Sequence, residues 1–267
     1  AQSSYAGDGD IVDIGCFLGA TTRALCEGLQ KNTKVTSKFA RITACDRFLF
    51  DAPSLEKAVA GRATLGQTIL PVFYDAIAGH TEKVNVVPFP TNTVRWCGRP
   101  IELLVAGAVR NPQINAHIFS EFVPKMMPGK SILVHREMLR HYRPFVTYAF
   151  AYLADHFELI GINGATAVLG YRKPIPQEKI LRLVENRFSQ EERVELVEQY
   201  TSTLTDAAEK WGFQAQSAWV ALKYQSLARA QALIDGLKEM PGISLDASRD
   251  AAIKRLQWAL DNPKTEA

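Results

Sequence analysis

The sequence predicts an α/β fold: a doubly wound, mostly parallel sheet of about seven strands, followed by an all-helical C-terminal extension. Short, β-branched apolar runs alternate with amphipathic helical segments as far as residue 172. Such alternation is typical of parallel strands that are joined by right-handed crossovers. Beyond Lys173-Pro-Ile-Pro176 the apolar residues recur only at helical spacing. We therefore expect two domains, residues 1–173 and 174–267.

The first half of the sheet is predicted from three apolar runs. Residues 10–14 are β-branched and lead directly into glycines, which is typical of a buried strand. Residues 41–46 form a second strand that ends in an acid, and residues 83–88 form a third. Between the first two strands, five residues at helical spacing predict a helix ending near Gln30: Leu18, Thr22, Leu25, Cys26 and Leu29. Residues 54–79 read as a helix broken by Gly66 and Pro71.

The second half is predicted in the same way. Residues 101–106 and 131–135 read as strands, and the helix 112–127 between them ends at the turn Pro128-Gly129. A helix over 144–156 precedes two closing strands, 157–163 and 166–172, which we expect to pair as a hairpin. In the extension we expect two to four helices packed as hairpins. We expect the aromatic side chains of these helices to be buried: Trp211, Trp219, Tyr224 and Trp258.

Composition narrows the class of partner. Hydrophobic residues make up 47% and charged residues 22% of the chain, which is typical of a globular protein. A net charge of +3 is too mild to predict a nucleic-acid partner, and no apolar run approaches the roughly 20 residues of a membrane span. The four cysteines have no metal-like spacing and predict reduced thiols. We expect a cytoplasmic protein that acts on a small molecule.

A glycine-rich turn follows the first predicted strand. Such a turn, placed between a strand and a helix, presents free backbone N–H groups to a ligand at the carboxyl edge of the sheet. A dinucleotide site favours three glycines, G-x-G-x-x-G, whereas only Gly15 and Gly19 are present here. Asp13 precedes them within the strand, which suits a ligand with a cationic ammonium and sulfonium. Asp46 ends the second strand, where it can accept hydrogen bonds from ribose hydroxyls.

These residues resemble a known family. Asp13-x-Gly15-x-x-x-Gly19, with Thr21 beyond it and Asp46 ending the next strand, is similar to class I Rossmann-like S-adenosylmethionine (SAM)-dependent methyltransferases. The stretch from Tyr5 to Thr21 resembles a bacterial subgroup often encoded near sugar-modifying genes, which implies sugar or natural-product O-methylation. The resemblance covers roughly residues 5–173.

The resemblance also implies roles for particular residues. Asp13 would contact the amino group of SAM or its water shell, and Asp46 would bind the ribose. Thr21 would bind the methionine carboxylate, and Phe89 would lie near the adenine. The other residues of the implied cofactor site belong to the glycine-rich turn and to the loop after the second strand: Gly15, Cys16, Phe17, Gly19 and Arg47.

No catalytic metal is expected. Metal-dependent members of this fold carry an acid at the end of the fourth strand, where this chain has Gly107. Glu137 alone supplies too few oxygen ligands for Mg²⁺. Alignment of the reacting groups would then do most of the catalytic work. A hydroxyl acceptor also needs a base, for which His135 is the first candidate and Glu137 and His141 are the others; alternatively, His135 ends a strand and Glu137 pairs with Arg136 or Arg140.

Other interpretations stay open. His80 and the segment from Arg95 to Arg99 could line a substrate rim, although a solvated loop explains the segment equally well. His117 is expected to be a packing or surface residue. Gly107 and the long helical tail also fit a catalytically lapsed binding or scaffolding subunit, and a nicotinamide-dependent oxidoreductase is a third reading. We expect the extension to cover the site or to form a homodimer interface.

Overall fold

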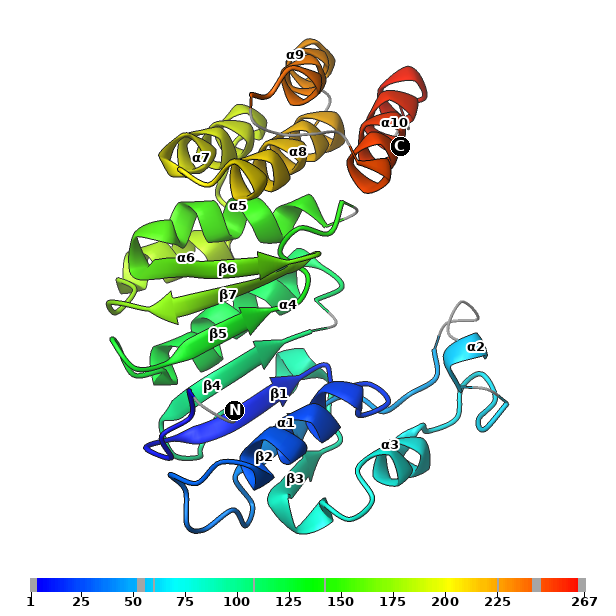
Figure 1. Ribbon diagram of the computed structural model, residues 1–267, viewed down its shortest axis with the longest axis vertical. Coiled ribbons are helices and arrows are strands. Elements are labelled where there is room, and N and C mark those ends of the chain that lie inside the picture. Colours follow the sequence, from blue (N-terminus) through cyan, green and yellow to red (C-terminus); the bar gives the residue numbers. More distant parts are fainter. Residues whose placement is uncertain are drawn as a thin grey trace. The chain divides into compact units, whose positions relative to one another are not determined.

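The computed structural model describes residues 4–51, 56–59, 61–107, 109–141, 143–224, 226–241 and 246–263. It has a seven-stranded sheet with the strand order β3-β2-β1-β4-β5-β7-β6 (Figure 1). The strands are β1 (Asp10–Ile14), β2 (Ile42–Cys45), β3 (Val84–Val87), β4 (Ile101–Ala106), β5 (Ile132–His135), β6 (Phe157–Asn163) and β7 (Thr166–Tyr171). The predicted α/β class and the seven strands are confirmed.

Parallel pairing extends from β3 to β5. In the centre of the sheet, Ile14 of β1 is in register with Cys45 of β2 and with Ala106 of β4. The carboxyl ends of these three strands therefore meet at one edge, where ligands bind in open α/β sheets. β6 and β7 are neighbours joined by only two residues, a link too short for a parallel crossover. The predicted hairpin is therefore present.

The chain divides into two compact units. The first consists of residues 1–136 and 168–174, and the second of residues 137–167 and 175–267. Each unit thus contains two separate stretches of the chain. The prediction of domains 1–173 and 174–267 rests on the sequence and stays a prediction.

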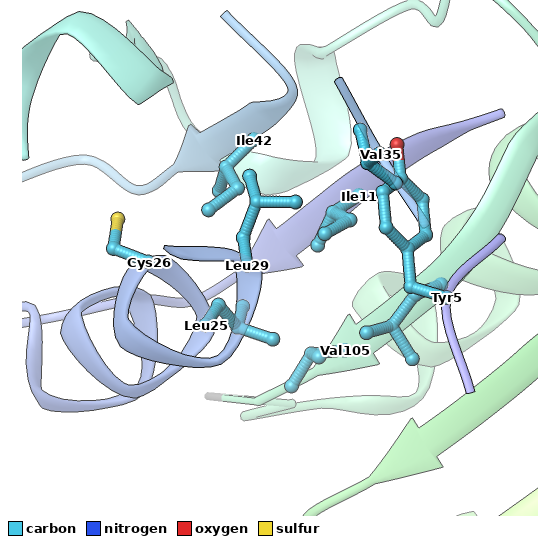
Figure 2. Packing of buried hydrophobic residues seen from close by; sticks show 9 residues of the cluster. Tyr5, Ile11, Leu25, Cys26, Leu29, Val35, Ile42 and Val105 are labelled. Atoms are coloured by element: carbon cyan, nitrogen blue, oxygen red, sulfur yellow. The ribbon is translucent and has the colours of Figure 1, made fainter. Parts of the chain in front are cut away.

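Helix α1 (Ala20–Gln30) packs on one face of the first unit's sheet. Its buried side chains Leu25 and Leu29 point toward Ile11 of β1 and Ile42 of β2, and Val105 of β4 joins the same cluster (Figure 2). Because side chains alternate along a strand, Asp13 and Arg136 continue the face that carries Ile11 and Ile132-x-Val134. The helix face predicted from spacing is therefore the one that covers the sheet.

The remaining helices of the first unit are short. α2 (Glu56–Val59) and α3 (Leu70–Ala76) replace the broken helix predicted over 54–79, and Pro71 occupies the first turn of α3. The N-cap residue of α4 (Pro112–His117) is Asn111, whose side chain accepts a hydrogen bond from the Ile114 N–H. A π-helical turn over 118–122 and a 3₁₀ turn over 123–125 follow it, where the sequence predicted one regular helix.

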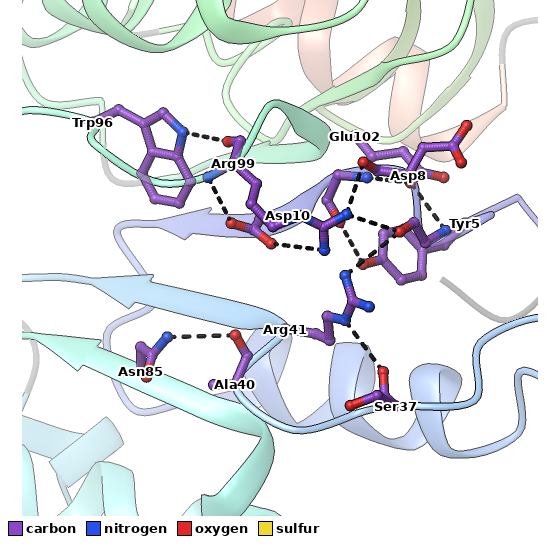
Figure 3. A network of polar contacts seen from close by, with 12 residues as sticks. Tyr5, Asp8, Asp10, Ser37, Ala40, Arg41, Asn85, Trp96, Arg99 and Glu102 are labelled. Carbon is purple, nitrogen blue, oxygen red and sulfur yellow. Dashed lines mark hydrogen bonds and ion pairs between the residues drawn. The ribbon is translucent and has the colours of Figure 1, made fainter.

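A polar network ties the start of the chain to the amino edge of the sheet (Figure 3). Glu102 of β4 is almost fully buried, and its carboxylate accepts hydrogen bonds from the N–H groups of Ala6, Gly7 and Gly9. The buried Tyr5 hydroxyl donates to the Gly9 carbonyl at 2.6 Å. Both carboxylate oxygens of Glu102 therefore have backbone donors.

The second unit contains α5 (Pro144–Leu153) and, within the described part of the extension, α6 (Gln177–Val184), α7 (Gln190–Thr203), α8 (Ala207–Lys223), α9 (Leu227–Lys238) and α10 (Ala247–Asp261). The expectation of two to four helices was therefore too low. Helices α8 to α10 share a core that includes Trp211, Ile234 and Leu256. Trp258 on α10 is 63% exposed, so the prediction that it is buried was wrong. No described helix has the length and apolar character of a membrane span.

Candidate functional site

The glycine-rich turn lies at the carboxyl end of β1, as predicted. Gly15, Phe17 and Gly19 all have positive φ angles, of 72°, 50° and 86°, so the backbone reverses sharply before α1. The Gly15 N–H donates to the Cys45 carbonyl, and Gly19 is the N-cap residue of α1. A Cβ atom at Gly19 would lie 3.0 Å from the Phe73 ring. Glycine therefore serves both the left-handed backbone and the close packing on α3.

Asp13 lies beneath this turn and is fully buried. Its Oδ2 accepts a hydrogen bond of 2.6 Å from the Thr22 hydroxyl, but its Oδ1 is buried and has no hydrogen-bond partner. Burial raises the pKa of Asp13 to about 6, although the Thr22 hydrogen bond and the Arg136 charge both act to lower it. A buried acceptor without a donor is costly, so this oxygen is suited to a ligand donor.

Asp46 joins the turn to the loop after β2. Its Oδ2 accepts from the Phe17 N–H at 3.0 Å, and its Oδ1 accepts from the Phe48 N–H at 2.9 Å. Each oxygen retains a further lone pair, and the side chain is partly exposed. Asp46 can therefore hold the turn in shape and still accept hydrogen bonds from a ligand.

Arg136 reaches the first turn of α1, a contact that the sequence analysis missed. Its Nη1 donates to the Thr21 Oγ1 at 2.8 Å, and its backbone N–H donates to the Ala106 carbonyl. The sequence carries a signal for this contact: alternation along Ile132-Leu-Val-His135 places residue 136 on the α1 face and residue 135 on the other face. A guanidinium beside a threonine hydroxyl offers donors to a carboxylate.

Gly107, which follows β4, brings that strand close to the turn. Its N–H donates to the Ile14 carbonyl at 2.7 Å. A Cβ atom at this position would lie 3.2 Å from the carbonyl oxygens of Ile14 and Gly15. A carboxylate side chain would crowd the backbone here.

Arg47 does not join Asp46 but pairs with Asp51. Asp51 Oδ2 accepts hydrogen bonds from Arg47 and, at 2.6 Å, from Arg110 Nη1, which extends from the loop after β4. Burial acts to raise the pKa of Asp51, but the hydrogen bonds from Arg110 and Arg47 outweigh it and lower that pKa. Asp51 Oδ1 is buried and has no hydrogen-bond partner. No motif in the sequence marks Asp51 or Arg110 as a site residue.

Cys16 and Phe89 differ in exposure. The Cys16 side chain is buried in a cluster with Phe48 and Phe73, and burial raises the pKa of its thiol well above the usual value. Only the backbone of Cys16 is therefore suited to ligand contact. Phe89, just beyond β3, is 57% exposed. An exposed aromatic ring can stack on a planar ligand.

The predicted bases lie in different surroundings. His135 is fully buried, and its Nε2 lies 3.3 Å from the Asn115 Oδ1. In the second unit, Glu137 pairs with Arg143 at 3.1 Å and with Arg140 at 3.6 Å. His141 packs on the Trp219 ring, and burial together with the Arg255 and Arg140 charges lowers its pKa. Their roles as bases stay predictions.

The other sequence candidates lie away from the turn. The segment from Arg95 to Arg99 leads into the amino end of β4, where the Arg99 guanidinium donates to the Gly7 and Asp8 carbonyls. It therefore lies at the opposite edge of the sheet from the glycine turn. His117 contacts the Val94 carbonyl, and His80 lies beside Lys83.

Among the residues that the structure describes, no group of three or more His, Cys, Asp or Glu side chains is arranged to hold a metal ion. No protein-family model matches the chain, and no curated protein is significantly similar to it.

Proposed function

We propose that the chain is a SAM-dependent methyltransferase of the class I, Rossmann-like type that acts on a small hydroxylated substrate. The observation that carries this proposal is Asp13: a fully buried carboxylate under a glycine turn, with one oxygen that has no hydrogen-bond partner. Dinucleotide sites bring an anionic pyrophosphate to such a turn, and a buried carboxylate there would repel it. A cationic ammonium group would instead satisfy the Asp13 oxygen.

The neighbouring residues suit the rest of the cofactor. Thr21 and Arg136, joined by a hydrogen bond of 2.8 Å, would hold the methionine carboxylate through charge-assisted bonds. Asp46 would accept hydrogen bonds from the ribose hydroxyls, and the exposed Phe89 would stack on the adenine. Arg47 pairs with Asp51 and is not needed among the residues that would bind the cofactor.

SAM supplies a methyl group that is already activated on a sulfonium, so the protein's task is to orient the acceptor and remove its proton. His135, Glu137 and His141 are the candidates for that base. The contact of His135 with Asn115 and the ion pairs of Glu137 argue against those two residues. The lowered pKa of His141 keeps its imidazole neutral at pH 7, the form that accepts a proton.

Isothermal titration of the intact chain tests the cofactor assignment. S-adenosylhomocysteine, the demethylated product, should bind with measurable heat, and NAD⁺ should not. Asp13→Asn should weaken the binding of S-adenosylhomocysteine at least tenfold. No heat with S-adenosylhomocysteine, or equal affinity of wild type and variant, would reject the role proposed for Asp13.

A catalytically lapsed binding subunit is the second candidate. The contact of His135 with Asn115 favours it, because this contact gives the ring a packing role within the folded protein. This candidate predicts that S-adenosylhomocysteine binds, but that methyl transfer to a panel of sugars and phenols is absent and His135→Ala changes nothing. Methyl transfer that is lost in His141→Ala would instead establish an enzyme.

We also propose that the helical extension after residue 174 has a separate role, as a cover for the site or as a homodimer interface in a cytoplasmic protein. The exposed side chain of Trp258 on α10 is the position that we use to test an interface. Sedimentation at increasing concentration should show a dimer that Trp258→Ser weakens. A monomer at every concentration would reject the interface and leave the cover as the proposed role of the extension.

A further inference from the structure

The loops that follow β2 and β4 meet through one carboxylate. Arg47 and Asp51 belong to the loop after β2, and Arg110 belongs to the loop after β4. In the strand order, β2 and β4 flank β1 on opposite sides. Because the three strands are parallel, both loops start at the edge where β1 enters the glycine turn. The arginine pair therefore belongs to the same edge of the sheet as the proposed cofactor site.

The arrangement has the chemistry of an anion site that already holds a carboxylate. Two guanidinium groups converge on a single oxygen, Asp51 Oδ2, while Oδ1 is buried without a hydrogen-bond partner. Guanidinium forks match carboxylate and phosphate groups best when two oxygens share the donors. Asp51 therefore uses the donors of Arg47 and Arg110 incompletely, and a ligand anion with two accessible oxygens could use them better.

The charges on this edge also favour an anionic ligand. In the proposed function, Asp13 and Asp46 serve the ammonium and the ribose, and Arg136 serves the methionine carboxylate. Arg47 and Arg110 then face one acid, Asp51, which leaves one positive charge. The side chains of Arg47 and Arg110 are 40% and 43% exposed, so a ligand can reach them, and partly exposed ion pairs are weak enough to exchange partners.

We propose that Arg47 and Arg110 bind an acidic group of the methyl acceptor, a carboxylate or a phosphate, and that Asp51 occupies this site as an internal substitute until the acceptor arrives. The acceptor class is therefore narrowed to hydroxylated anions, such as acidic sugars or sugar phosphates. The inference rests on the proposed function where it identifies the anionic ligand as the methyl acceptor. Anion binding itself can be measured without cofactor.

The test is a titration of the intact protein with two separate probes, inorganic phosphate and malonate, followed through the Arg side-chain NMR signals. Asp51→Asn removes the internal carboxylate and should tighten binding of the preferred probe about tenfold, whereas Arg110→Gln should weaken it at least tenfold. Arg23→Gln is the matched control, since Arg23 also forms an exposed ion pair, with Glu27 on α1, and it should change nothing. The stronger probe identifies phosphate or carboxylate as the preferred group.

Three results would overturn the proposal: no binding of either probe to Asp51→Asn, equal affinities for wild type and Arg110→Gln, or an equal loss in Arg23→Gln. Thermal unfolding of each variant establishes that it is folded. S-adenosylhomocysteine is titrated in parallel, and its affinity should be the same in Arg110→Gln as in wild type. If the wild type binds the anions but not S-adenosylhomocysteine, the proposed function is rejected; if it binds S-adenosylhomocysteine but the anion titration fails, only this inference is rejected.

Discussion

Two buried carboxylates on neighbouring strands of the first unit differ in whether both of their oxygens accept hydrogen bonds. Glu102, at the amino edge of β4, accepts hydrogen bonds from the N–H groups of Ala6, Gly7 and Gly9. Asp13, near the carboxyl edge of β1, has one oxygen bonded to Thr22 and one with no hydrogen-bond partner. Both side chains are almost completely removed from water.

The difference separates a structural role for Glu102 from the binding role that we propose for Asp13. A buried charge whose acceptor oxygens are all used stabilises the segment that supplies the donors. A buried charge with an unused oxygen destabilises the free protein, and a ligand can offset that cost. Glu102 therefore fixes the start of the chain on the sheet, whereas in the proposed function Asp13 favours the bound state. Variants at the two residues should have opposite effects on stability.

The largest expected effect follows from removing Glu102. Glu102→Ala leaves three backbone donors without their charged acceptor, so we expect the free energy of unfolding to fall by about 3–5 kcal/mol, at about 1.5–3 kcal/mol for each bond to a charged group, less what water restores. Urea denaturation measures this loss. If Glu102→Ala does not fold, Glu102→Gln should show a smaller loss. Asp8→Ala, which breaks only the exposed pair with Lys130, is the control and should change stability little.

Asp13→Asn should act in the opposite direction. A pKa that rises from 3.8 in the unfolded chain to about 6 in the folded protein corresponds to about 3 kcal/mol of destabilisation above pH 6. The asparagine removes the buried charge but adds amide donors that lack partners, so we expect a net gain of about 1–2 kcal/mol at pH 8. Urea denaturation at pH 8 measures it. A loss of stability would show that the Asp13 carboxylate is structural.

The pH dependence of stability tests the raised pKa of Asp13 directly. Because the pKa of Asp13 is raised by folding, its contribution favours the folded state fully below pH 4 and is lost as the pH rises through about 6. The stability difference between Asp13→Asn and wild type should therefore grow in favour of the variant from pH 4 to pH 7 and then level off. Denaturation curves at half-unit pH steps measure it, and a difference that stays constant would contradict the raised pKa.

The smallest effect concerns Arg136. Arg136→Met keeps the apolar stem but loses the donor to Thr21, so S-adenosylhomocysteine should bind about tenfold more weakly, or about 1.4 kcal/mol. Calorimetry measures the change. Arg23→Met, on the same helix as Thr21, should leave the affinity unchanged. An unaltered affinity in Arg136→Met would remove the methionine carboxylate from this position.

Much of this first unit follows from sequence pattern. The strands over 10–14 and 101–106 have the predicted bounds, and Gly15, Gly19 and Asp46 surround the turn as expected. Local spacing determines these features. Asp51 and Arg110 could not be paired in advance, because 59 residues separate them and only the sheet order brings their loops to one edge.

The contacts of three further residues, Thr22, Arg136 and His135, follow from local periodicity. Thr22 was counted among the buried residues of a helix face, and burial indeed puts its hydroxyl in reach of Asp13. Arg136 contacts Thr21 on the α1 face of the sheet, whereas His135 contacts Asn115 on the other face. The orientation of a polar side chain at a strand end decides whether it can contact a ligand, and that orientation follows from the period of two.

The central claim is that Asp13 binds the ammonium group of the cofactor. Its most direct test is a double-mutant cycle in which S-adenosylhomocysteine and the analogue that lacks the α-amino group are each titrated into wild type and Asp13→Asn. We expect that loss of the amino group weakens binding at least tenfold in wild type and scarcely at all in Asp13→Asn. An equal loss in both proteins would contradict it, because the ammonium would then bind elsewhere.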